Sequence, residues 1–193
     1  MKKYFFTFIG QYRFLTLFFA LFIGITMTQS CKKSDTVTPA QATLYDSLGG
    51  TTMVADPSNP GTMIEKGRLG IRSVLDSTIF VIAGDTAING HFTVLLSEVT
   101  MGNYSGFTAL SKNLTDFVCV ATGAKNFSYG GKSMTAAHDP AQNSRMNGKA
   151  DSGDFDAFVN DLVKGAQKNG LSTTQINSVG RLVNTLRSQV VQM

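Results

Sequence analysis

The apolar residues between positions 64 and 84 recur at intervals of three and four, the spacing of one face of an α-helix. Gly84 and Asp85 follow the last of them and end the pattern. The β-branched content of this stretch would also suit a strand, but the spacing favours a helix. The predicted buried positions are Ile71, Val74, Leu75, Thr78, Ile79 and Ile82.

A second helix is predicted from Phe107 to Ala121, where Gly123 is suited to the left-handed conformation that commonly ends a helix. A third begins at a cap formed by Asp151 or Ser152 and ends at Gly170. Their apolar stripes are Phe107, Leu110, Leu114, Phe117, Val118 and Ala121 in the second helix, and Phe155, Phe158, Val159, Leu162, Val163 and Ala166 in the third.

A fourth helix follows the run STTQ at 172–175, which matches a capping box. Its apolar positions extend from Ile176 to Val190. A short helical stripe at 44–48 ends at Gly49-Gly50, and residues 51–63 and 139–150 have the proline, glycine and Asx content of loops. Residues 86–106 have no clear pattern. Because no strong strand alternation is present, residues 43–193 are predicted to form one small all-α domain.

The N-terminus has the pattern of a secretory signal: basic residues precede the apolar run FLTLFFALFIGI. The run is about a dozen residues long, short of the roughly 20 that span a bilayer. Thr28, Gln29 and Ser30 precede Cys31, as in bacterial lipoproteins, although such signals more often carry an apolar residue at the position of Thr28. We expect a signal peptide at 1–30, a flexible tether at 31–42, and a cell-envelope protein held to a membrane by lipid on Cys31. The alternative is an ordinary signal peptide with an incidental cysteine.

Removal of residues 1–30 would leave 14 basic and 13 acidic residues, a net charge of +1. No basic patch remains, so nucleic acid is not an expected partner. Cys119 would be the one unmodified cysteine, and its apolar neighbours predict a buried, unreactive thiol.

Catalytic motifs are not evident, since the sequence lacks CxxC, HExxH, GxSxG and phosphate-binding loops. The run DSGDFD at 151–156 lacks the spacing of an EF-hand loop and is better explained by helix capping. His138 is one of two histidines and has only Asp139 beside it as another candidate ligand. Such a histidine is most often a surface residue, but a lone imidazole can also ligate a haem.

Three segments together resemble the truncated haemoglobins of group I: LYDSLGG at 44–50, DFVCVATGAKNFSYGGKSMTAAH at 116–138 and DFDAFVNDLV at 154–163. The resemblance covers most of residues 43–193 in the family's order. It implies a two-over-two helical sandwich around a haem. It places His138 at the proximal iron ligand, Met134, Phe155 and Phe158 against the haem, and Phe92 of NGHF at the phenylalanine that stacks on the macrocycle.

The distal side departs from that family. The position that commonly holds a ligand-binding tyrosine aligns with Ile79, or with Phe80 after a slip of one residue. Leu110 and Leu114 occupy the distal positions of the following long helix, the second of which often holds glutamine. The absence of a phenol or amide donor weakens the expectation of tight O₂ binding and of NO dioxygenation. The chain is also longer than the family pattern at 51–63, within 93–106 and at 139–150.

Three hypotheses follow for the function. The first is an envelope-tethered haem globin that binds O₂, NO or CO at the iron, with no electron donor identified. The second is a haem enzyme acting on NO, peroxide or another oxidant. The third is a haem-free, globin-like lipoprotein with a binding or structural role. A second axial ligand at His91 is a further option, less favoured than an exposed turn histidine.

Overall fold

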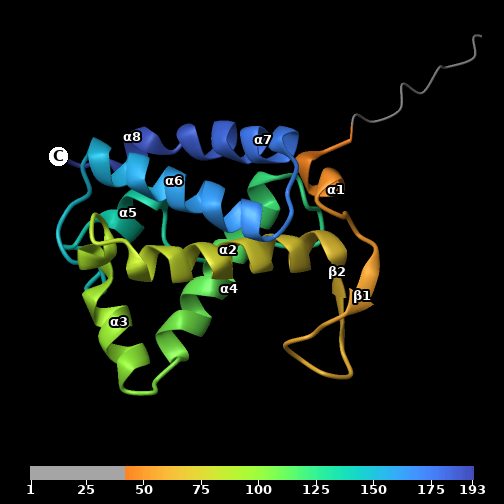
Figure 1. Cartoon of the computed structure of the whole chain (residues 1–193), viewed down its shortest axis with the longest axis horizontal. Helices are drawn as coiled ribbons and strands as arrows, with labels where there is room; N and C mark the ends of the chain where they lie inside the picture. The colour runs from red at the N-terminus through yellow and green to blue at the C-terminus, as the bar shows by residue number, and fades with distance from the viewer. Residues whose placement is uncertain (1–41) are drawn as a thin grey trace, which may run out of the picture. The chain divides into compact units, whose positions relative to one another are not determined.

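The computed structural model describes residues 42–193 (Figure 1). The predicted signal peptide at 1–30, the proposed lipid site at Cys31 and all but the last residue of the predicted tether at 31–42 lie outside the described residues.

Four long helices form two layers. They are α2 (Lys66–Gly84), α4 (Ser105–Ala121), α6 (Ser152–Lys168) and α7 (Thr173–Asn184). In Figure 1, α6 and α7 lie above α2 and α4, and α2 packs against both α4 and α6. The predicted all-α, two-over-two helical sandwich is confirmed for the long helices.

The face of α2 that packs in the centre matches the sequence pattern. All six predicted positions are buried: Ile71, Val74, Leu75, Thr78, Ile79 and Ile82. Three of them, Ile71, Val74 and Leu75, join a core to which α6 contributes Phe155, Leu162 and Ala166 and α7 contributes Val179 and Val183. The helical spacing therefore outweighed the β-branched content of this segment.

The segment predicted as a loop at 51–63 contains a short hairpin, which corrects that expectation. β1 (Met53–Ala55) pairs antiparallel with β2 (Met63–Glu65), with Val54 opposite Ile64. The connecting turn is closed by a hydrogen bond from the amide of Asp56 to the carbonyl of Thr62 at 3.0 Å. Strands of three residues are too short to show an alternating pattern, so the sequence gives only the turn signals.

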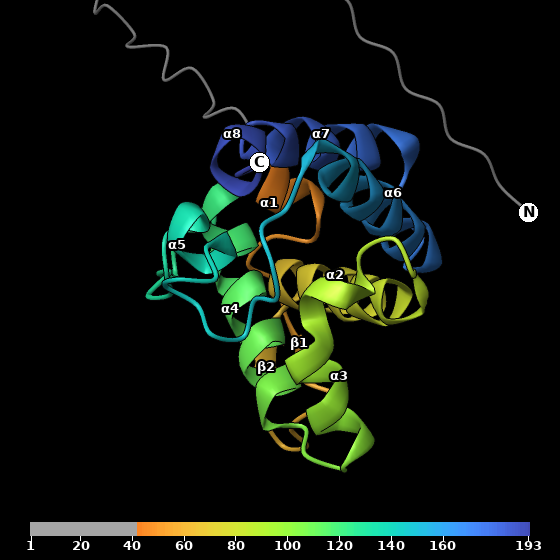
Figure 2. The same ribbon diagram turned by 90° about the vertical axis from the view of Figure 1, so that its left-hand side faces the viewer.

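Short helices complete the fold. They are α1 (Leu44–Ser47), the 3₁₀ turn η1 (Asn89–Phe92), α3 (Thr93–Thr100), α5 (Met134–His138) and α8 (Arg187–Val190). Figure 2 shows α3 and the start of α4 below the two layers, with the chain reversing direction between the two helices. The poorly patterned stretch 86–106 thus contains η1 and α3, and its buried apolar residues are Ile88, just before η1, and Leu95 in α3.

The predicted fourth helix is divided in two. The amide of Thr185 bonds the carbonyl of Leu182 at 3.1 Å, three residues back, and its hydroxyl donates to the same carbonyl at 2.7 Å. These bonds tighten the turn and end α7 at Asn184. The capping box predicted at Ser172–Gln175 is present. Of the two caps considered for α6, Asp151 is the one observed, and it forms a capping box with Asp154 that was not predicted.

Within residues 42–193, no single helix has the length and hydropathy needed to cross a membrane. The helix α2 and residues Asn89–Thr100 meet those criteria only together, as a pair bent by 107°.

Candidate functional site

His138 is the last residue of α5, and its ring is oriented by the backbone of its own helix. Nδ1 lies 2.8 Å from the carbonyl oxygen of Met134. A carbonyl can only accept a hydrogen bond, so this contact places the proton on Nδ1 and leaves the lone pair on Nε2. The side chain is half-buried. A neutral imidazole in this state is a ligand for one metal centre through Nε2.

The five-residue helix α5 is too short to be stable alone, and contacts from outside hold it. Ser133 caps its start by accepting the amide of Ala136 at 3.2 Å. Gln192, near the C-terminus, donates from Nε2 to the carbonyl of Thr135 at 2.9 Å. Asn143 donates to the carbonyl of Ala137 at 2.7 Å and so satisfies the last turn. The position of His138 is thus fixed from both sides of its helix.

The helix α4 buries a different face from the one its apolar pattern predicts. The predicted stripe of Leu110, Leu114, Phe117 and Val118 is only half-buried. The buried positions are instead the smaller and more polar Ser111, Thr115 and Cys119, one residue further along. One residue corresponds to about 100° around a helix. The apolar face of α4 is therefore only partly covered by the described chain.

Polar contacts with α2 explain this rotation. Ser111 donates to Asp76 at 2.5 Å, and Arg68 forms an ion pair with Asp116 at 2.7 Å. Lys112 also reaches Asp116, at 2.6 Å. Burial raises the pKa of Asp116, but the hydrogen bonds from Lys112 and Arg68 outweigh burial and lower it overall. Asp116 is thus held as a carboxylate, and the polar face of α4 is fixed against α2.

The two phenylalanines of α6 lie together, with ring centroids 6.4 Å apart. Phe155 is 2% exposed and belongs to the core, and the guanidinium of Arg187 lies 4.3 Å from its ring centroid. Phe158 is half-buried at the edge of the same core. Of the pair, Phe158 therefore has more of its surface available to a bound group.

The predicted distal residues lie on two helices. Ile79 is buried on α2, whereas Phe80 is 66% exposed and packs on Phe107 with ring centroids 5.5 Å apart. The inward residue of the two is thus Ile79. Phe92, the last residue of η1, is half-buried, as are Leu110 and Leu114 on α4.

The tyrosines of residues 42–193 do not supply a phenol at the position of Ile79. Tyr45 is buried and donates to Glu65 at 2.7 Å, and burial followed by that bond raises its pKa. Tyr129 meets Phe117 edge-on but donates its hydroxyl to the carbonyl of Lys132 at 2.6 Å. Tyr104 is 60% exposed.

His91 has contacts at both ring nitrogens. Nδ1 lies 2.7 Å from the carbonyl oxygen of Asn147, and Nε2 lies 3.1 Å from Oδ2 of Asp154. These contacts leave neither nitrogen available to a metal, so the option of a second axial ligand finds no support. The ring is also less exposed than expected for a turn histidine, with 17% of the side chain accessible. Sequence spacing could not have indicated this, because Asn147 and Asp154 are more than fifty residues away.

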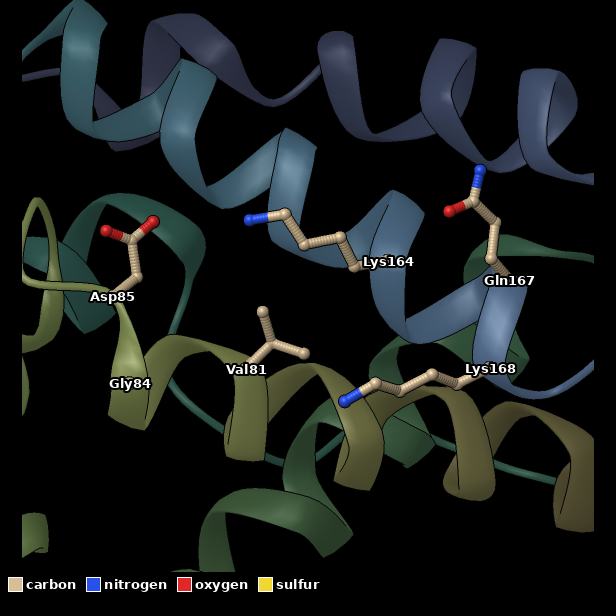
Figure 3. A pocket seen from close by; sticks show the side chains of 6 residues that line it. All are labelled: Val81, Gly84, Asp85, Lys164, Gln167 and Lys168. Carbon is tan, nitrogen blue, oxygen red and sulfur yellow. The ribbon is translucent and has the colours of Figure 1, made fainter.

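Two grooves lie apart from His138. One, of about 670 Å³, is bounded by Val81, Gly84 and Asp85 at the end of α2 and by Lys164, Gln167 and Lys168 on α6 (Figure 3). The other, of about 790 Å³, lies between the hairpin, α2 and the polar side of α4. Neither groove is lined by a predicted site residue. In the described part of the chain, no three His, Cys, Asp or Glu side chains are grouped as a metal site.

No protein-family description matches this chain, and no curated protein matches it. Solved structures do match its fold. Two are variants of the truncated haemoglobin of Tetrahymena pyriformis in the Fe(III) form, one tyrosine-to-phenylalanine and one glutamine-to-glutamate, each 18% identical to this chain. Their TM-scores are 0.54 and 0.56, and each match covers 79% of this chain and 100% of the other.

A third match is the 2/2 haemoglobin of Synechococcus sp. PCC 7002, in the cyanomet state with covalently attached haem. It is 21% identical, with a TM-score of 0.53, and the match covers 78% of this chain and 98% of that one. The two layers of long helices define the fold class as an all-α, two-over-two helical sandwich. Within that class, the chain has the fold of the truncated haemoglobins.

Proposed function

We propose that this protein is a haem-binding globin in which His138 is the proximal iron ligand. The observation that carries the proposal is the hydrogen bond from Nδ1 of His138 to the carbonyl of Met134, which leaves Nε2 with the lone pair. The truncated haemoglobin fold of the chain supports it.

Half-buried apolar residues of the chain have the character that an apolar macrocycle needs. Haem is large and flat, so its pocket needs apolar side chains that the protein leaves partly uncovered. The half-buried apolar side chains of η1, α4, α5 and α6 meet this need, and we assign haem contacts to Phe92, Leu110, Leu114, Met134 and Phe158. Phe155 would support Phe158 from the core side, in line with the ring contact between them.

When bound, haem supplies an iron that takes O₂, NO or CO. The role of the chain is to bind it, to orient the imidazole and to exclude water. Ile79, Leu110 and Leu114 present no hydrogen-bond donor to a ligand on the distal side. We therefore propose binding of a small diatomic ligand as the activity, and not an oxidative reaction that relies on a distal donor.

We further propose that the protein acts in the cell envelope, attached through lipid on Cys31. The support is the sequence order of basic residues, apolar run and cysteine. Incorporation of labelled fatty acid into the wild-type protein, and its loss in Cys31→Ser, tests this independently of haem. Labelling of both proteins alike would reject it.

Haem titration of the purified protein, followed by absorption, tests the proposed function. We expect a Soret band that saturates at one haem per chain and shifts when CO is added to the reduced protein. Failure to take up haem, with equal stability in its absence, would favour the haem-free alternative. Steady turnover of NO or peroxide well above that of free haem would favour the enzyme.

A further inference from the structure

The loop that follows His138 is held by hydrogen bonds within itself. The side chain of Asp139 accepts a hydrogen bond from the backbone amide of Ala141 at 3.0 Å. The backbone carbonyl of Asp139 accepts hydrogen bonds from the backbone amides of Gln142 and Asn143 at 2.9 and 2.8 Å. Together with the bond from Asn143 to Ala137, these contacts join residues 139–143 rigidly to α5. We refer to residues 139–150 as the strap.

The far part of the strap is bonded to η1, the turn that carries Phe92. The backbone amide of Asn147 donates to the backbone carbonyl of His91 at 3.1 Å. The backbone carbonyl of Asn147 accepts from Nδ1 of His91 at 2.7 Å. Its side chain also donates to the carbonyl of Gly90 at 3.0 Å. Two hydrogen bonds donated by Asn147 and one that it accepts fix the strap to Gly90 and His91, the two residues before Phe92.

An ion pair connects the strap to α3 and α4 as well. Nη1 and Nη2 of Arg145 each lie 2.7 Å from a carboxylate oxygen of Glu98, in a bidentate arrangement. The pair lies directly on Gly106 at the start of α4. A Cβ atom at Gly106 would overlap Oε2 of Glu98 and lie 2.6 Å from Nη1 of Arg145. The hydrogen bond from Arg145 lowers the pKa of Glu98, so the pair persists at neutral pH.

The strap therefore connects the proposed proximal ligand to three other elements: η1, α3 and the start of α4. Figure 2 shows the chain after α5 passing toward the junction of α2 and α3. We propose that Arg145, Asn147 and Glu98 are positioning residues that hold Phe92 and α4 at a fixed separation from His138. Under the proposed function, on which this inference rests, the strap keeps bound haem from escaping.

The ion pair can be tested by charge reversal with rescue. Haem transfer from the loaded protein to excess apomyoglobin would be timed for wild type, Arg145→Glu, Glu98→Arg and the double swap. We expect each single variant to lose haem at least about tenfold faster, because a bidentate pair becomes a like-charge contact, and the swap to recover most of that change. Arg181→Glu is the matched control, since Arg181 lies on α7, away from the strap, and its side chain bonds Ser178 of the same helix.

The site on α4 can be tested by Gly106→Ala, which separates Arg145 from Glu98 without changing a charge. Gly180→Ala on α7, where a Cβ would meet no atom within 4 Å, is its control. We expect faster haem loss in Gly106→Ala only. Equal rates in wild type, Arg145→Glu and Gly106→Ala, or a swap that recovers nothing, would overturn the role of the strap while leaving haem binding intact.

Hydrogen exchange of the haem-free protein separates this inference from the proposed function. Arg145→Glu should increase exchange in 89–98 and in 134–138 together, because the strap couples them. If wild type takes up no haem, the proposed function and the role in haem retention both fail. Faster exchange of 89–98 and 134–138 together would even then support the coupling of these two segments by the strap. Exchange that increases in one segment alone would refute the coupling.

Discussion

Nδ1 of His138 donates to the carbonyl oxygen of Met134, 2.8 Å away and four residues earlier. This spacing is one helical turn, so the imidazole and the group that orients it come from the same five-residue helix. Because the acceptor is a backbone carbonyl, any residue at 134 could supply it, so the bond explains the orientation of His138 but not the identity of Met134. Orientation of the ring depends on α5 remaining helical, which explains its several outside supports.

The apolar distal side leads to a prediction about ligand release. Leu114→Gln would place an amide donor on the apolar face of α4, where O₂ bound to the iron could accept a hydrogen bond. One such bond is worth about 1 to 1.5 kcal/mol, close to a tenfold change in rate. We expect O₂ to dissociate about tenfold more slowly, measured by stopped-flow mixing. Leu114→Met keeps the size and adds no donor, and it should release O₂ like wild type; slowing of both variants alike would exclude the hydrogen-bond explanation.

Asp116 leads to a prediction about pH. Its pKa is lowered in the folded protein, so its ion pair stabilises the fold above the unfolded pKa, which is near 4, and this stabilisation is lost as pH falls through the folded pKa. Asp116→Asn leaves Arg68 without its carboxylate and should cost about 2 kcal/mol at pH 7. Urea unfolding at several pH values should show the difference from wild type shrinking toward pH 3. A difference that is constant with pH would mean that the charge of Asp116 contributes nothing.

Cys119 should be unreactive in the folded protein. The side chain is fully buried, and burial raises the pKa of its thiol to about 11, despite the nearby guanidinium of Arg68. We expect no alkylation of Cys119 by iodoacetamide at pH 8 until guanidinium chloride is added as a denaturant and unfolds the chain. Mass spectrometry of the peptide that contains Cys119 measures this without interference from Cys31. Rapid modification of the native protein would show that the packing between α4 and α1 opens readily.

Gly67 allows a test of the packing between α1 and α2. A Cβ at this position would lie 2.8 Å from Cζ of Tyr45 and 3.0 Å from the amide nitrogen of Gly50. Gly67→Ala should therefore destabilise the fold by about 1 to 3 kcal/mol through overpacking. Gly84→Ala, at a position with no atom within 4 Å, is the control and should be neutral or slightly stabilising. Equal unfolding midpoints for the two variants would contradict this packing.

Much of the fold could be predicted because its long helices follow simple periodicity. The six predicted positions of α2 are buried, Asp151 caps α6 as one of the two predicted candidates, and the capping box at Ser172 lies where the STTQ run predicts it. The hairpin at 53–65 could not be predicted, because three-residue strands carry too little pattern and depend on the turn between them. The division of α7 from α8 depends on the hydrogen bond from the hydroxyl of Thr185 to the carbonyl of Leu182. It could not be predicted, because the apolar pattern continues without interruption through this position.

The candidate site was predicted only in part. No helix was predicted at 134–138, so the hydrogen bond from Nδ1 of His138 to the carbonyl of Met134 became evident only in the structure. The rotation of α4 was missed, since periodicity identifies the apolar face of a helix but not what covers it. The strap was also missed, because Arg145 and Glu98 are 47 residues apart and only the folded chain brings them together.

The absorption spectrum of His138→Ala after reconstitution with haem tests the central claim most directly. Wild type should show a Soret band distinct from that of free haem, and the variant should show a weakened or shifted band that added imidazole restores. His91→Gln should keep the wild-type band position, because both nitrogens of His91 face other partners. A Soret band in His138→Ala identical to that of wild type would contradict the assignment of His138 as the iron ligand.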